Sequence, residues 1–164
     1  MPKYIFALIA VVSFTLTPVA AEQCSPGSHI YKDNRDGTVT DKCTKIIWQQ
    51  ATNSTDLQFS DADSYCTNLS LAKYSDWRLP TIDELLTIVD YTLFSPAADP
   101  ILQIPPHDPN TGYDPVLWSS TPNQYGSRPL VWGVDFFLGS TVSSMPTTNG
   151  SVALAKCVRS KRSD

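Results

Sequence analysis

The chain has little of what catalytic and nucleic-acid-binding proteins usually carry. Only two of its 164 residues are histidine, and no His-x-x-x-His or Glu-x-x-His spacing offers a metal site. The serine pair at 119–120 lacks the flanking glycines of a nucleophile elbow. With 12 basic against 16 acidic side chains, the chain has no electrostatic footprint for nucleic acid or polyanionic sugars. These absences argue against a metalloenzyme, a serine hydrolase and a nucleic-acid-binding protein.

The sequence also lacks an apolar run of the ~20 residues that a membrane-spanning helix needs. The shorter run Tyr4–Leu16 follows Lys3 and precedes small residues at 19–21, the pattern that a signal peptidase recognises. We therefore predict a signal peptide over residues 1–21. The mature chain, residues 22–164, is then a single domain that is secreted or periplasmic, with no membrane attachment after cleavage. Loss of Lys3 changes the formal charge from −4 to −5.

All four cysteines lie in the predicted mature chain, and an oxidising compartment lets disulfides persist. They are Cys24, Cys43, Cys66 and Cys157. Four cysteines admit three pairings, and the residues alone do not choose among them. Apolar runs surround Cys66 and Cys157, and nothing near them in sequence lowers a thiol pKa. Structural disulfides are therefore favoured over a catalytic cysteine.

Short β-prone runs flank turn residues near the start of the mature chain. The Asp-Gly pair at 36–37 predicts a hairpin over residues 30–40, because glycine accepts the positive φ of such turns. Residues 46–48 predict a further strand. The hairpin resembles the middle of a calcium-binding loop, but Lys32 and Cys43 stand where that loop requires acids. A simple turn is the favoured interpretation.

Two helix signals follow these strands. Ser60, with Asp63 three residues later, predicts the start of a first helix that buries Cys66. Thr81 and Glu84 form a capping box for a second helix. The apolar stripe of this second helix consists of Ile82, Leu85, Leu86 and Val89.

The second half of the chain combines a long loop with strands. Residues 91–114 are rich in proline and lose regular periodicity, which is typical of a functional or disordered loop. Strands are predicted at 116–118, at 130–138 by alternation, and at 152–158. The order of the elements predicts an α+β domain with two helices, antiparallel strands and long irregular loops.

Four blocks of sequence resemble the Lcl C-terminal domain family, a bacterial family long described as a domain of unknown function. The blocks are Asp33–Asp41 followed by Trp48, Trp77–Leu86, Trp118–Thr121 and Cys157–Arg159. The resemblance covers residues 33–159. It implies a C-type-lectin-like fold, related in shape to formylglycine-generating enzymes. The best-known member of the family is a bacterial surface adhesin domain that binds sulfated glycans and forms trimers.

The same resemblance selects one disulfide pairing. Lectin-like folds join a helix to the terminal strand, and this implies a bond between Cys66 and Cys157. Cys24 and Cys43 then remain to tie the N-terminal segment to its own hairpin.

The candidate ligand-binding residues lie on loops that no periodic pattern buries. They are Tyr113, Asp114, Asn123, Tyr125 and Arg128. Exposed aromatic and amide groups suit the recognition of sugars or proteins. No catalytic or metal-binding residues are predicted, although Asp108, Asn110 and Asp114 offer oxygen ligands for calcium. Trp77 and Trp118 adjoin buried runs, so we expect them in the core rather than on a sugar-stacking surface.

Together these features favour an exported, non-catalytic recognition domain that binds a glycan or an envelope or host protein. Two alternatives stay open. One is an enzyme of the sulfatase-modifying, formylglycine-generating type. The other is a structural component of the cell envelope without a small ligand. The sequence does not specify the ligand or the oligomeric state.

Overall fold

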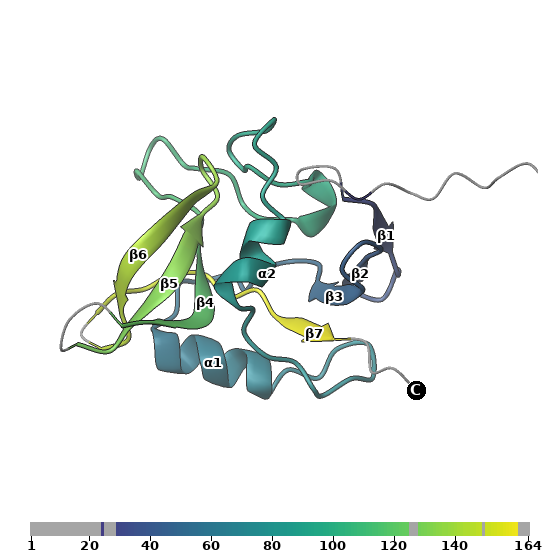
Figure 1. The fold of residues 1–164 in the computed structure, drawn as a ribbon, viewed down its shortest axis with the longest axis horizontal. Helices are drawn as coiled ribbons and strands as arrows, with labels where there is room; N and C mark the ends of the chain where they lie inside the picture. Colours follow the sequence, from purple (N-terminus) through teal and green to yellow (C-terminus); the bar gives the residue numbers. More distant parts are fainter. Residues whose placement is uncertain (1–23, 25–28, 125–127, 149, 161–164) are drawn as a thin grey trace, which may run out of the picture.

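Two antiparallel sheets and two α-helices make up the described part of the protein, with helix α2 between the sheets and helix α1 along one side (Figure 1). The structure, a computed structural model, describes Cys24 and residues 29–124, 128–148 and 150–160. The signal peptide predicted over residues 1–21 lies outside this part of the chain. Within the described residues, no helix has the length and apolar character needed to cross a membrane. The architecture agrees with the predicted α+β class.

The first sheet unites the N-terminal hairpin with the last strand. Its strands are β1 (Tyr31–Asp33), β2 (Thr38–Asp41), β3 (Ile46–Gln49) and β7 (Val158–Ser160), in the order β1-β2-β3-β7. The predicted hairpin is confirmed: Gly37 has a φ of 84°, and the Asp36 carboxylate accepts a 2.6 Å hydrogen bond from the Thr38 hydroxyl. The predicted strand at 152–158 is shorter and later, because residues 153 and 154 form only isolated bridges with other segments.

The second sheet is a three-stranded meander. It consists of β4 (Val116–Asn123), β5 (Leu130–Asp135) and β6 (Ser140–Pro146) in sequential order. The strand predicted over 130–138 is confirmed as far as Asp135, but its regular alternation and its extension to residue 138 are wrong. A register shift interrupts β5 after Val131, and the strand ends at Asp135, whose carboxylate accepts a 2.7 Å hydrogen bond from the Phe137 amide. Leu138 therefore lies in a turn with 61% of its surface exposed.

Helix α1, Phe59–Thr67, begins earlier than its sequence signal indicates. Gln58 is the N-cap residue and makes no side-chain cap, so the predicted Ser60 cap is wrong. The Phe59 ring packs edge-on against Trp118 at 5.6 Å between ring centroids. This packing, rather than a capping hydrogen bond, accompanies the start of the helix.

Helix α2, Ile82–Thr87, has the predicted capping box. The Thr81 hydroxyl accepts from the Glu84 amide at 3.2 Å, and the Glu84 carboxylate accepts from the Thr81 amide at 2.8 Å. Arg78 donates two further hydrogen bonds to the same carboxylate, at 2.6 and 2.7 Å. One carboxylate thus joins the helix start to the Trp-Arg-Leu-Pro segment that precedes it.

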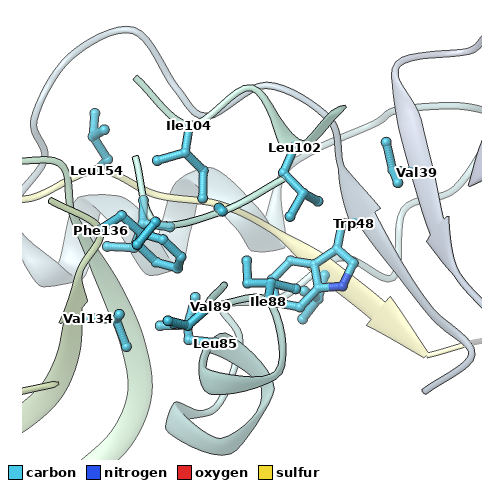
Figure 2. Packing of buried hydrophobic residues seen from close by; sticks show 14 residues of the cluster. Val39, Trp48, Leu85, Ile88, Val89, Leu102, Ile104, Val134, Phe136 and Leu154 are labelled. Carbon is cyan, nitrogen blue, oxygen red and sulfur yellow. The ribbon is translucent and has the colours of Figure 1, made fainter. Parts of the chain in front are cut away.

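The core forms where both sheets meet α2 (Figure 2). Trp48 from β3, Leu85 from α2 and Phe136 after β5 are fully buried in one cluster. The long loop contributes Leu102 and Ile104 to that cluster, so part of this loop is packed rather than free. A second cluster surrounds Trp77, Trp118 and the inward-facing Cys66, which confirms their predicted place in the core.

Both disulfides have the predicted pairing. Cys24 is bonded to Cys43 and Cys66 to Cys157, which leaves no free cysteine. Two disulfides indicate that the protein folds in an oxidising environment. The second bond joins α1 to the residue directly before β7, so it links distant parts of the chain inside the core.

Removing the two disulfides should have unequal effects on stability. The Cys66–Cys157 bond closes a separation of 91 residues and the Cys24–Cys43 bond one of 19. Chain entropy predicts a loss of ~4–5 kcal/mol for the first pair replaced by alanine and ~3 kcal/mol for the second. Denaturant unfolding of the two double variants measures both. Equal losses, or a larger loss at Cys24–Cys43, would contradict this ordering.

The capping box gives a second test. Thr81→Ala should lower the free energy of unfolding by ~1 kcal/mol, because the Glu84 amide loses its acceptor. Ser60→Ala is the matched control, since Ser60 is exposed and caps nothing. An unchanged melting temperature for Thr81→Ala, or equal shifts in both variants, would show that the cap does not stabilise α2.

Candidate functional site

The predicted ligand-binding residues fall in two separate places. Tyr113 lines an open cleft between the long loop and the segment after β3. Asn123 and Arg128 line a groove beside β4 and β5. Asp114 lies next to Tyr113 in sequence and is hydrogen-bonded to His107. Tyr125 lies outside the described residues. The structure therefore divides one predicted surface into two candidates.

The first candidate, which we call the Tyr113 cleft, has a volume of about 440 Å³. One wall is formed by residues 52–56, and the other by Gln103, Pro105 and Tyr113 of the long loop. Buried Leu154 lies between these walls. Most of the lining residues carry a hydroxyl, amide or carboxylate group, which suits a polar ligand.

The first wall is held in place by the chain before β7. The Asn53 amide donates to the Ala155 carbonyl at 3.1 Å, and the Asn53 side-chain oxygen accepts from the Ala155 amide at 2.6 Å. Leu57 and Ala153 exchange two backbone hydrogen bonds, at 2.9 and 3.1 Å. Four hydrogen bonds therefore lay this wall along a buried segment.

The second wall is held by apolar anchors. A 3₁₀ turn, η1 (Pro100–Leu102), ends at Gln103, which adopts a left-handed φ of 47°. Leu102 and Ile104 point into the core on either side of it (Figure 2). Gln103 is thereby exposed towards the cleft with no intraprotein hydrogen bond to its side chain among the described residues. Its amide is free to meet a ligand.

Tyr113 and Asp56 join the two walls. The Tyr113 hydroxyl donates to the Asp56 carboxylate at 3.1 Å, although the two residues are 57 positions apart in sequence. Burial raises the pKa of the Tyr113 phenol, and the Asp56 charge raises it further. Among the described residues that line the cleft there is no lysine or arginine. The lining of the cleft therefore carries the negative charge of Asp56 beside an aromatic ring.

The second candidate, the Asn123 groove, is more apolar and has a volume of about 500 Å³. Its lining includes Phe59, Pro122, Pro129, Leu130, Val131, Asn123 and Arg128. A neighbouring hollow shares Asn123 and Leu130 and adds Trp132, Ser143 and Ser144. The Asn123 amide donates to the Ser143 carbonyl, so it bridges β4 and β6 rather than standing free.

In the long loop, two of the three candidate calcium ligands, Asp108 and Asp114, already make hydrogen bonds through their carboxylates. The Asp108 carboxylate accepts from the Asn110 amide at 2.9 Å and from the Thr111 hydroxyl at 3.0 Å. These hydrogen bonds lower the pKa of Asp108. The Asp114 carboxylate is 2.7 Å from His107 Nδ1. The loop acids therefore stabilise their own turn and a histidine.

One other cluster of possible metal ligands occurs in the described part of the chain. It brings together His29, Asp41 and Cys43. The sulfur of Cys43 is bonded to Cys24, so it is not a thiolate. His29 and Asp41 are instead paired with each other at 2.7 Å. This cluster does not form a metal site.

Several lining residues carried no signal in the sequence. Asn53, Asp56 and Gln103 belong to short polar segments that resemble ordinary surface loops. The feature that identifies them is their position opposite Tyr113. That position depends on tertiary pairing between residues far apart in the chain.

Comparison with protein families gives one match. The model of the Lcl C-terminal domain matches residues 37–159, which cover most of the chain and include both walls of the Tyr113 cleft. Comparisons with curated proteins and with solved structures find no match. The sequence blocks, the two disulfides and the family match agree, and the chain belongs to the Lcl C-terminal domain family.

Proposed function

We propose that this protein is an exported, C-type-lectin-like recognition domain that binds an uncharged glycan in the Tyr113 cleft without transforming it. The observation that carries this proposal is the Tyr113–Asp56 pair across an open polar cleft. An aromatic ring offers a face to the apolar side of a sugar ring. The Asp56 carboxylate accepts hydrogen bonds from sugar hydroxyls, and such charge-assisted bonds are strong.

The charge of the cleft favours an uncharged sugar over a sulfated one. Asp56 repels a sulfate group, and no cation among the described lining residues offsets it. The exposed Gln103 side chain and the hydroxyls of Ser54 and Thr55 supply neutral donors and acceptors. A neutral, hydroxyl-rich oligosaccharide meets all of these groups.

Export and the absence of catalysis are parts of the same proposal. The predicted signal peptide and the oxidised cysteines support export. A formylglycine-type reaction needs a reactive thiol, and all four cysteines are in disulfides. The adjacent carboxylates of Asp83 and Glu84 lie in the first turn of α2, where Glu84 caps the helix.

A glycan array tests this function directly. The mature chain, purified after export, should bind neutral oligosaccharides in preference to sulfated ones. Tyr113→Ala and Asp56→Asn should each weaken binding at least tenfold, because each removes a group that faces the ligand. Tyr91→Ala is the matched control, since Tyr91 is an exposed tyrosine of the same loop outside the cleft.

Three results would contradict the proposal. They are binding to sulfated glycans only, no saturable binding to any glycan, and equal weakening by the Tyr91 control. Circular dichroism of each variant separates loss of a contact from loss of the fold.

A second candidate function, docking to a protein, is favoured by an exposed apolar patch. The patch consists of Tyr91, Leu93, Phe94 and Leu138, with 70%, 40%, 74% and 61% of their surfaces exposed. Its two segments are joined by hydrogen bonds from the Ser95 and Ala97 amides to the Phe137 and Phe136 carbonyls. Clustered apolar side chains of this kind usually mark an interaction site.

The charge around the patch indicates the kind of protein that fits. Residues 79–127 contain no lysine or arginine, and Asp90 and Asp135 flank the patch in sequence. A partner surface with an apolar centre and a basic rim complements this arrangement.

An amphipathic peptide of leucine and lysine is a suitable probe for the patch. It should bind more tightly than a leucine–glutamate peptide, and Phe94→Ser should weaken binding about tenfold. Val152→Ser, at an exposed apolar residue elsewhere in the sequence, should not. Binding that is equal in both variants, preference for the acidic peptide, or self-association lost in Phe94→Ser would contradict docking to a basic partner.

A further inference from the structure

Lys156 is completely buried, yet its ammonium group has no carboxylate partner among the described residues. Its relative exposure is 0%, and its Nζ donates to two backbone carbonyls, of Gln50 at 2.7 Å and of Leu102 at 2.6 Å. Lysine is almost never fully buried unless it is paired with a charge. Burying an ammonium is costly, and a methionine of similar length would fill the same space without that cost. The burial of a lysine here is therefore explained by the two carbonyls that its Nζ holds, rather than by the space that it fills.

Those carbonyls belong to residues that closely precede the two walls of the Tyr113 cleft in sequence. Gln50 is two residues before the first wall, residues 52–56, and Leu102 is the residue before Gln103 of the second wall. Leu102 also ends η1, where a carbonyl has no partner within the turn. One nitrogen atom is thus hydrogen-bonded to the segments that lead into both walls.

The neighbouring residues of Lys156 complete this attachment. Leu154 lies in the cleft, and Ala155 holds Asn53 of the first wall through two hydrogen bonds. Cys157 follows and is bonded to Cys66 of α1. Lys156 therefore stands on a segment that the disulfide and these hydrogen bonds keep fixed.

The charged surroundings of Lys156 are sparse. The titratable groups on the elements around it are Asp56 on the first wall, Asp99 before η1 and Tyr113 on the second wall. None of them is hydrogen-bonded to its Nζ. Burial alone lowers the pKa of Lys156 to about 7. Its protonation therefore depends on whether the cleft stays closed.

We propose that Lys156 is a positioning residue for the Tyr113 cleft: its Nζ holds the two walls at the spacing that lets Tyr113 meet Asp56. The attachment of the walls stands on the hydrogen bonds themselves. Only its consequence for a glycan rests on the proposed function.

Hydrogen exchange of the wild type and of Lys156→Met tests the attachment without a ligand. The variant leaves the Gln50 and Leu102 carbonyls without their donor. Protection of amides in residues 50–57 and 102–113 should fall at least tenfold, while amides of β5 keep their protection relative to global unfolding. Lys45→Met, at an exposed lysine, is the control. Unchanged wall protection, or a uniform loss across the chain, would overturn the proposal.

The pH dependence of amide protection in the wild type gives a second test. A side chain that only fills space would not produce such a dependence. The pKa of Lys156 in the folded protein, about 7, is below its ordinary value of 10.5. At a pH between about 7 and 10.5, Lys156 binds a proton in the opened or unfolded chain but not in the chain with a closed cleft. The equilibrium constant for closing the cleft therefore rises with pH above 7, by up to about tenfold per pH unit. Protection factors of wall amides should rise accordingly between pH 7 and pH 9.

A flat pH profile in the wild type would overturn the proposal even if Lys156→Met fails to fold. Where the variant folds, its own profile should be flat. A neutral oligosaccharide selected on the array then separates the two hypotheses. If the variant shows weak protection of the walls but the wild type binds no glycan, the glycan function is contradicted. The attachment of the walls by Lys156 is then still supported. Equal affinity of both proteins for that oligosaccharide contradicts the positioning role.

Discussion

The structure depends on one buried stretch, residues 153–159, which runs between the two sheets and contacts β3, β4, α1 and the 3₁₀ turn η1. All seven of these residues are buried. Leu154 exchanges backbone hydrogen bonds with β4, since its amide donates to Val116 and its carbonyl accepts from Trp118. Cys157 is bonded to α1, and Val158 pairs with Trp48 of β3. The stretch therefore joins two sheets that share no strand (Figure 1).

The candidate site is a consequence of the same stretch. Its residues support one wall of the Tyr113 cleft through Asn53, place Leu154 between the walls, and hold both walls through Lys156. The disulfide at Cys157 keeps this support from shifting relative to α1. Loops on a rigid scaffold are a common location for recognition, because the scaffold lowers the entropy lost when a ligand binds. Here the scaffold and the site share consecutive residues.

Local chemistry explains which parts of the fold could be predicted. The Asp-Gly hairpin and the Thr81–Glu84 box are encoded within four residues, so the sequence identifies them. The disulfide pairing followed from the family resemblance. Strand β6 escaped prediction because its polar face leaves a weak alternation, and α1 begins at Phe59 because of packing against Trp118. Of the five predicted site residues, Tyr113 was placed in the cleft, but Asp56 and Lys156 were missed because their partners lie far away in sequence.

Native-state hydrogen exchange tests most directly whether residues 153–159 unite the fold. The relevant amides are those of Gln49, Trp118, Leu154 and Val158, which donate to or belong to this stretch. If the stretch holds both sheets together, these amides exchange only through global unfolding, with one common free energy that denaturant lowers with the full slope. Exchange of Leu154 and Val158 at a distinctly lower free energy than the strands β3 and β5 would show that the sheets are stable without it and would contradict this account.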